Sequence, residues 1–141
     1  MGEAFQDASR IYTERDGFAP ARLGGAVNVK WGAFAHTDLS AKKLFTLPAG
    51  AQIVGWIVAP TADFDGTTPV LDLGDGVTGD RFAADLALAN DTDVITAGFD
   101  GAALFTALAE DTDVYATYAD GGGGSAGAAV VGALYALVDE S

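Results

Sequence analysis

The sequence predicts an all-β protein, a single β-sandwich of jelly-roll-like type behind an extended N-terminal arm. From residue 26 to the C-terminus, segments with the composition and alternation of β-strands follow one another, separated by turn signals at intervals of roughly 8–12 residues. Segments with the 3.6-residue period of an amphipathic helix are almost absent. The chain has 141 residues, half of them apolar, which suits one domain built around one core.

The arm is predicted at residues 1–25, ahead of a sandwich domain at residues 26–141. Residues 1–25 show no sustained helix or strand period and end in Pro20 and Gly24-Gly25. Apolar side chains are spaced through the arm with arginines between them, which favours a segment that lies over another surface. The alternative is a terminus without fixed structure. The candidate residues for contact with a partner or a neighbouring subunit are Arg10, Ile11, Tyr12, Arg15, Phe18, Arg22 and Leu23.

Three strands are expected at the start of the domain. Apolar residues occupy every second position from Val27 to Ala33, which is the pattern of a half-buried strand. A second strand at 44–47 ends at Pro48-Ala49-Gly50, where proline presets φ and glycine can adopt positive φ. Residues 52–59 are mostly apolar on both sides of the alternation, so they are expected to form a central strand covered on both faces.

A hairpin is expected in the middle of the chain. Residues 70–73 run into Gly74-Asp75-Gly76, whose Asp-Gly pair suits a tight turn with positive φ, and the return arm is expected near Asp80-Arg81-Phe82. Residues 83–89 are rich in alanine and leucine, so either a short helix or an irregular excursion is expected there.

Further strands are expected in the last part of the chain. The tetrapeptide Asp-Thr-Asp-Val occurs at 91–94 and at 111–114, each time ahead of a β-prone run, as at two equivalent turns. Strands are expected at 104–108 and 114–118, followed by the glycine-rich loop 121–125. Residues 128–138 predict a long strand with apolar residues on both sides, and covering both sides would need a neighbouring subunit.

Charge divides the chain into a nearly neutral head and an acidic body. Residues 1–43 hold six of the seven basic residues, whereas residues 44–141 hold fifteen of the twenty acidic residues and a single base, Arg81. With a net charge of −13, the protein is not expected to bind nucleic acid or an anionic membrane surface. The apolar run at 126–138 is too short to span a bilayer, and the first residues lack the pattern of a secretory signal.

The sequence offers little for catalysis, so no enzyme activity and no catalytic residue are expected. There is no cysteine, and the serines fall in the expected arm, loops or terminus. The lone histidine, His36, follows a strand and is interpreted as a solvated loop residue rather than a general base.

Two aspartate-containing loops raise calcium as a possible ligand. They are Asp63-x-Asp65-Gly66 and Asp72-x-x-Asp75-Gly76. Neither has the spacing or the terminal glutamate of an EF-hand loop. Aspartates that cap the backbone of turns explain both patterns better, so no metal and no cofactor are expected.

Two short motifs in the middle of the chain carry a resemblance. The first is Thr46-Leu47-Pro48-Ala49-Gly50-Ala51, followed by the apolar strand and the Asp63-Phe64 loop, and the second is Gly74-Asp75-Gly76 followed by Asp80-Arg81-Phe82. In this order they resemble motifs of small structural proteins of tailed bacteriophages, in particular head decoration (cement) proteins with a jelly-roll-like β-sandwich. The resemblance covers roughly residues 42–138, does not extend to residues 1–30, and brings no catalytic residue with it.

The resemblance implies a virion structural protein on the capsid exterior, made in the host cytoplasm. Such a protein would bind the major capsid protein, stabilise the head and form a homo-oligomer, in particular a homotrimer. An acidic body would also keep a protein displayed in many copies soluble.

The alternative is a carbohydrate- or receptor-binding module of a phage head fibre or tail. In that case aromatic side chains would stack on sugar rings, and core packing is the competing interpretation of the same residues. The aromatics concerned are Trp31, Trp56, Tyr115 and Tyr118.

Overall fold

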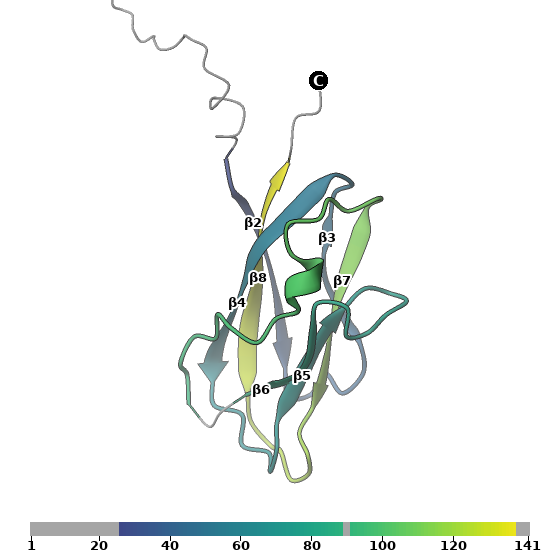
Figure 1. The fold of residues 1–141 in the computed structure, drawn as a ribbon. Helices are drawn as coiled ribbons and strands as arrows, with labels where there is room; N and C mark the ends of the chain where they lie inside the picture. The colour runs from purple at the N-terminus through teal and green to yellow at the C-terminus, as the bar shows by residue number, and fades with distance from the viewer. Residues whose placement is uncertain (1–25, 89–90, 138–141) are drawn as a thin grey trace, which may run out of the picture.

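The computed structural model of the chain describes residues 26–88 and 91–137, and these form two antiparallel β-sheets packed face to face (Figure 1). The all-β sandwich predicted from the sequence is confirmed. The described residues contain one short 3₁₀ helix, η1 (Gly101–Ala103), and the strands β2 (Asn28–Ala35), β3 (Lys42–Leu47), β4 (Ala51–Ala62), β5 (Val70–Gly74), β6 (Ala83–Ala87), β7 (Thr112–Ala119) and β8 (Ala128–Leu137).

The strand order is nested, as in a jelly roll. One sheet has the order β2-β8-β4 and the other β3-β7-β5-β6, so early strands pair with late ones across the whole domain. A jelly roll has eight strands in two Greek keys. In this protein the segment 91–107 runs along the free edge of β4, where an eighth strand would lie. It is held there by isolated bridges between Val58 and Ile95 and between Gln52 and Ala107.

Two predictions for this segment were wrong. No regular strand forms at 104–108, because Asp100 caps η1 through the amide N–H of Ala102 and Phe105 has a positive φ of 63°, which interrupts an extended backbone. Of the two Asp-Thr-Asp-Val copies, the second leads into β7 as predicted, whereas the first is followed only by the single bridge at Ile95.

Residues 83–87 are strand β6 and neither a helix nor an irregular excursion, which corrects the prediction for 83–89. β6 pairs antiparallel with β5, so the expected hairpin is present. Asp85 has φ 50° and its N–H donates to the Asp72 carboxylate, and this kink lets both Ala83 and Leu86 reach the core. Pairing with β5 overrides the helical propensity of alanine and leucine.

The hairpin loop is wider than the predicted Asp-Gly turn. Neither Gly74 nor Gly76 has positive φ. The Asp75 carboxylate closes the loop by accepting the N–H groups of Val77 at 2.8 Å and Thr78 at 2.5 Å. The turn predicted after β3 does form as expected, with Gly50 at φ 86° and the Ala51 N–H bonded to the Pro48 carbonyl.

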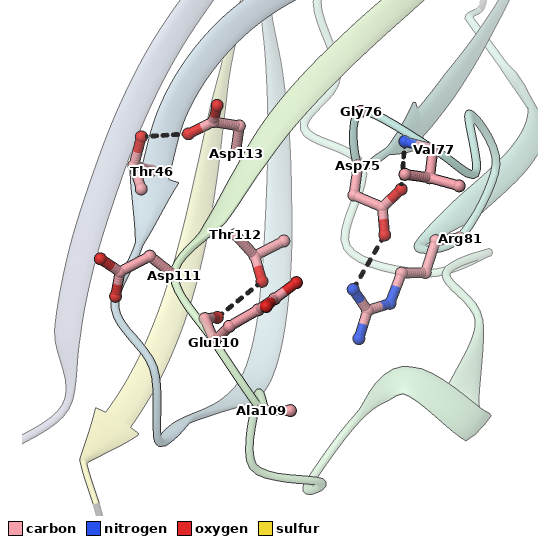
Figure 2. A pocket seen from close by; sticks show the side chains of 10 residues that line it. All are labelled: Thr46, Asp75, Gly76, Val77, Arg81, Ala109, Glu110, Asp111, Thr112 and Asp113. Atoms are coloured by element: carbon pink, nitrogen blue, oxygen red, sulfur yellow. Dashed lines mark hydrogen bonds and ion pairs between the residues drawn. The ribbon is translucent and has the colours of Figure 1, made fainter.

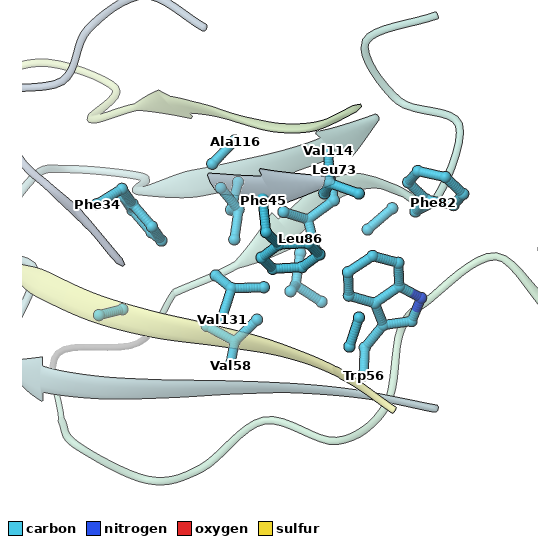
Figure 3. Close-up of a cluster of buried hydrophobic side chains, with 14 of the residues drawn as sticks. Phe34, Phe45, Trp56, Val58, Leu73, Phe82, Leu86, Val114, Ala116 and Val131 are labelled. Atoms are coloured by element: carbon cyan, nitrogen blue, oxygen red, sulfur yellow. The ribbon is translucent and has the colours of Figure 1, made fainter. Parts of the chain in front are cut away.

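Aromatic side chains fill the space between the two sheets (Figure 3). Trp56 stacks on Phe45 and Phe99 and tilts against Phe82, with a centroid distance of 5.2 Å to Phe82. A second group is formed by Phe34, Phe64 and Tyr118, whose ring centroids are 5.1–6.0 Å apart. Trp56 and Tyr118 are therefore core residues.

The side of β2 that faces the core is not the side that the alternating pattern predicted. Val29 and Trp31, on the apolar side of the alternation, are 42% and 53% exposed, while Phe34 on the other side is buried. Gly32 faces inward, where a Cβ atom would lie only 2.6 Å from the Cβ of Leu44. This close approach of β2 to β3 requires glycine and places Trp31 on the outside.

β4 is likewise not the central strand that its apolar sequence predicted. β8 occupies the middle of the three-stranded sheet, and β4 lies at one end with its free edge covered by residues 95–107. The Leu108 N–H donates to the Ala51 carbonyl, and the Phe105 N–H donates to the Ile53 carbonyl. The apolar sequence of β4 therefore reflects the loop of the same chain that covers this strand, and not a central position in the sheet.

Candidate functional site

The arm residues predicted to make contact lie outside the described residues. These are Arg10, Ile11, Tyr12, Arg15, Phe18, Arg22 and Leu23. The first strand of the described residues, β2, begins at Asn28. Contact by the arm remains a prediction.

A pocket of about 600 Å³ lies between the β5–β6 hairpin loop and the start of β7 (Figure 2). Carboxylates and hydroxyls line it. The Thr46 hydroxyl donates to Asp113 Oδ1 at 2.6 Å, and the Thr112 hydroxyl donates to the Glu110 carbonyl at 2.9 Å. On the opposite wall Arg81 Nη1 lies 2.9 Å from Asp75 Oδ2.

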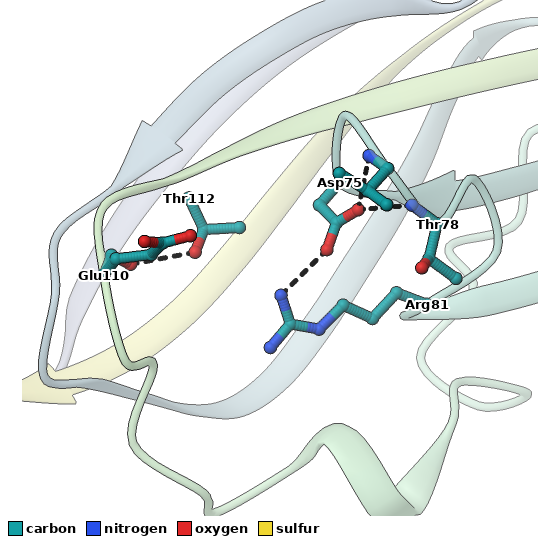
Figure 4. A network of polar contacts seen from close by, with 6 residues as sticks. Asp75, Thr78, Arg81, Glu110 and Thr112 are labelled. Atoms are coloured by element: carbon teal, nitrogen blue, oxygen red, sulfur yellow. Dashed lines mark hydrogen bonds and ion pairs between the residues drawn. The ribbon is translucent and has the colours of Figure 1, made fainter.

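The Asp75 carboxylate in this pocket is engaged by N–H groups of its own loop and by Arg81 (Figure 4). Burial alone would raise the pKa of Asp75, but the N–H groups of Thr78 and Val77, together with Arg81, hold that pKa below its ordinary value. The Thr46 hydroxyl, with a further contribution from Lys43, lowers the pKa of Asp113. Both groups are therefore ionised at neutral pH and act as acceptors, whereas a general acid needs a raised pKa.

His36 lies apart from this pocket, at the end of β2. Its N–H donates to the Gly127 carbonyl at 2.9 Å, and its Nδ1 is 3.3 Å from the same oxygen. The side chain is half-buried, which differs from the solvated loop histidine expected, and its contacts tie β2 to the start of β8.

In the two candidate calcium loops Asp75 caps its own turn, as predicted, whereas Asp65 and Asp72 accept backbone N–H groups of other segments. Asp65 accepts the N–H of Ser125 at 2.7 Å, the Ser125 hydroxyl at 2.8 Å and the N–H of Ala126 at 2.9 Å. Asp75 closes its own loop as described above. Within residues 26–88 and 91–137, no group of three or more histidine, cysteine, aspartate or glutamate side chains is arranged to hold a metal ion, and no helix is long and apolar enough to cross a membrane.

The outer sides of the two sheets differ in chemistry. The outer side of the four-stranded sheet carries Asp72, Asp113 and Thr117, which alternate with buried residues. The outer side of the three-stranded sheet carries Trp31 and Val29 on β2 and half-buried apolar residues on β4 and β8.

The four aromatics considered for sugar stacking do not come together. Trp56 and Tyr118 are 3% and 2% exposed. Trp31 and Tyr115 point outward from different sheets, because Trp31 lies on β2 and Tyr115 on β7. These side chains do not form a common platform.

Comparisons with known proteins identify chains of similar structure but no match by sequence. No family model and no curated protein sequence matches the chain. A chain of the capsid asymmetric unit of cyanophage Pam1 matches with a TM-score of 0.61 and 24% identity over 97% of this chain and 99% of that chain. A chain of the acidic stable capsid of Helicobacter pylori bacteriophage KHP30 matches with a TM-score of 0.61 and 19% identity, over 81% of this chain and 90% of that chain. A chain of the capsid of Ralstonia phage GP4 matches with a TM-score of 0.61 and 16% identity, over 82% and 87%.

At these identities the likeness establishes a shared fold. Function does not follow from fold alone, because one sandwich architecture serves many roles.

Proposed function

We propose that this protein is a bacteriophage virion structural protein, specifically a decoration or cement protein that binds the outer capsid surface and stabilises the head. One observation carries the proposal: the fold is shared with a chain of a phage capsid over 97% of this chain and 99% of that chain. That capsid component is thus a small protein of about the same length. Two further capsid chains share the fold over most of their length.

The partner of this protein is the major capsid protein, and the contact is made by the N-terminal arm. The arm holds three basic and four acidic residues and is nearly neutral, whereas the body after residue 43 holds one base and fifteen acids. An acidic capsid surface would therefore repel the head of the chain, residues 1–43, far less than it would repel the body. Arginine and tyrosine, both present in the arm, are the residue types that most often anchor interfaces.

A structural role without catalysis agrees with the chemistry of the described pocket, where Asp75 closes its own loop and Asp113 joins β7 to Thr46 of β3. The protein functions as a homo-oligomer, a trimer in this proposal, located on the virion exterior after synthesis in the host cytoplasm. The acidic body keeps many displayed copies soluble and apart.

The test is add-back to capsids purified from a phage that lacks the gene. We expect the protein to sediment with these capsids and to raise the temperature at which they break. Free protein in the supernatant together with an unchanged breaking temperature would overturn the decoration role. Binding to fibres or tails in a parallel experiment would favour the receptor-binding alternative.

A further inference from the structure

The three-stranded sheet carries almost no charge in a protein that is otherwise strongly acidic. Strands β2, β8 and β4 contain no aspartate or glutamate, and Lys30 is their one charged residue. The chain as a whole has twenty acidic residues. In the other sheet, β5, β6 and β7 each carry an aspartate. The side of the molecule formed by the three-stranded sheet therefore lacks strand carboxylates, whereas the side formed by the four-stranded sheet carries them.

Paired residues on this sheet form apolar rows across its outer side. Trp31, Gly132 and Ile57 are neighbours in one row, because β8 pairs with β2 on one side and with β4 on the other. The two rows that flank this one on the same side of the sheet have Val130 and Leu134 as their β8 residues. Directly paired residues of an antiparallel sheet lie on the same side. We call this surface the outer apolar face: Val29, Trp31, Ile57, Ala59, Val130 and Leu134.

Trp31 is the most prominent side chain of this face. Its ring lies over Gly132, where an added Cβ would be 2.6 Å from Cζ3 of the indole, yet the residue stays 53% exposed. Large aromatics that are held in place and half-exposed at the centre of an apolar surface are typical of interface anchors.

The two edges of this sheet are treated differently. The edge of β4 is covered by the chain's own segment 95–107. β2 is the other end of the sheet and has no strand partner beyond it within the described residues. Its pairing with β8 has no register shift, and its sequence has no proline, so it lacks two of the usual devices that prevent edge pairing.

The charge of the chain indicates which partner can cover the outer apolar face. Each copy of the chain carries a net charge of −13. Asp113 is paired with Lys43 at 3.4 Å, but two copies that met through the four-stranded sheet would place Asp72 and Asp85 opposite other carboxylates, which is unfavourable. The outer apolar face is the side on which two such acidic molecules can approach without that repulsion, and apolar burial then drives the contact.

We propose that a second copy of this chain packs on the outer apolar face, with Trp31 as its anchor. This rests on the proposed function in one respect, because it locates the subunit contact of the oligomer proposed there. The arm is left free for the capsid, so subunit contact and capsid attachment use different parts of the chain.

The experiment compares Trp31→Lys with Val77→Lys in the full chain. Both replace an exposed apolar side chain with a base, but Val77 is 95% exposed on the β5–β6 loop, away from the outer apolar face. In sedimentation equilibrium we expect Trp31→Lys to raise the subunit dissociation constant at least about tenfold, as for an anchor residue, and Val77→Lys to leave it unchanged. Equal association of the two variants, or a wild-type chain that is monomeric throughout the micromolar range, would overturn the proposal.

Crosslinking provides a second measurement that does not depend on how well Trp31→Lys folds. The chain has no cysteine, so Val29→Cys and Val77→Cys each introduce a single thiol. A short bis-maleimide is expected to join two copies through position 29 and not through position 77. Equal yields at both positions would contradict the proposal. Capsid binding by wild-type protein, measured separately, tests the proposed function: a monomer that still binds capsids would remove the copy contact and leave that function standing.

Discussion

Asp65 accepts both the backbone N–H and the side-chain hydroxyl of Ser125, across 60 residues of sequence. The same carboxylate accepts the N–H of Ala126, so the loop after β4 is joined to the loop before β8. These bonds to Ser125 and Ala126 lower the pKa of Asp65, because they favour the ionised form.

This contact predicts a pH dependence of stability. A carboxyl whose pKa is lower in the folded state stabilises that state above its unfolded value of 3.8, and the contribution is lost as pH falls through the folded value. Asp65→Asn should therefore lower Tm at neutral pH, and the difference from wild type should shrink below about pH 4. Thermal melts followed by circular dichroism between pH 7 and pH 2.5 measure this.

The matched control is Asp63→Asn, two residues away and also exposed. It removes the same charge without removing the Ser125 bonds, so its Tm should stay close to that of wild type at every pH. A constant Tm deficit of Asp65→Asn down to pH 2.5 would show that its effect is not the loss of the ionised acceptor.

Gly127 is predicted to be intolerant of alanine for two reasons. Its φ is +136°, and a Cβ atom would overlap the ring of buried Phe64. Backbone strain and overpacking together should lower the free energy of unfolding by at least about 2 kcal/mol. Urea denaturation measures this directly.

Two other glycines separate these causes. Gly122 also has positive φ, +109°, but a Cβ there would meet nothing within 4 Å, and Gly79 has neither feature. We expect destabilisation by alanine to decrease from Gly127 to Gly122 to Gly79. Equal losses at Gly127 and Gly122 would mean that Phe64 gives way without cost.

Replacement of Tyr118 by phenylalanine is expected to maintain or increase the stability of the fold. Its ring packs against Phe34 and Phe64, but its hydroxyl is buried without a hydrogen-bond partner among the described residues. Removing it should leave the free energy of unfolding unchanged or raise it by up to about 1 kcal/mol. Burial, with Asp120 and Asp65 nearby, also raises the pKa of Tyr118 above 10.0. Wild type should therefore lose stability above pH 10, where the unfolded chain ionises first, and Tyr118→Phe should lose less.

Tyr115→Phe is the control, since Tyr115 lies on the outer side of β7 and is only half-buried. It should not change stability at neutral pH. A fall of Tm in Tyr118→Phe would indicate that the hydroxyl has a partner, such as a bound water molecule.

Local patterns predicted most of the strands because their information is local. Alternation identified β2, β7 and β8, and the Pro48-Ala49-Gly50 turn was identified from the conformations these residues permit. The same local logic identified Asp75 as a turn cap, whereas the contact of Asp65 with Ser125, 60 residues away, was not predicted.

What the sequence could not provide depends on contacts between distant strands. The inward side of β2 is decided by Gly32 against Leu44, and an alternating pattern alone does not show this. The strand state of 83–87 comes from pairing with β5. The outer apolar face was visible in part, as the two-sided apolar character of 128–138, but its centre at Trp31 required the register of β2 on β8.

The last prediction concerns the arm, which in the proposed function attaches the protein to the capsid. Deleting residues 1–25 should leave a folded oligomer, because the described core begins after residue 25 and the proposed subunit contact lies on the sheet. The truncated protein should no longer sediment with capsids.

Tyr12→Ala combined with Arg15→Ala should weaken sedimentation with capsids without changing Tm, because one base and one aromatic anchor are lost. The control is Leu39→Ala combined with Lys42→Ala, which removes one base and one exposed apolar side chain from the β2–β3 connection and the start of β3. If the truncated protein binds capsids as well as the full chain, or the control weakens binding as much as the arm variant, the sandwich itself holds the contact and the arm does not.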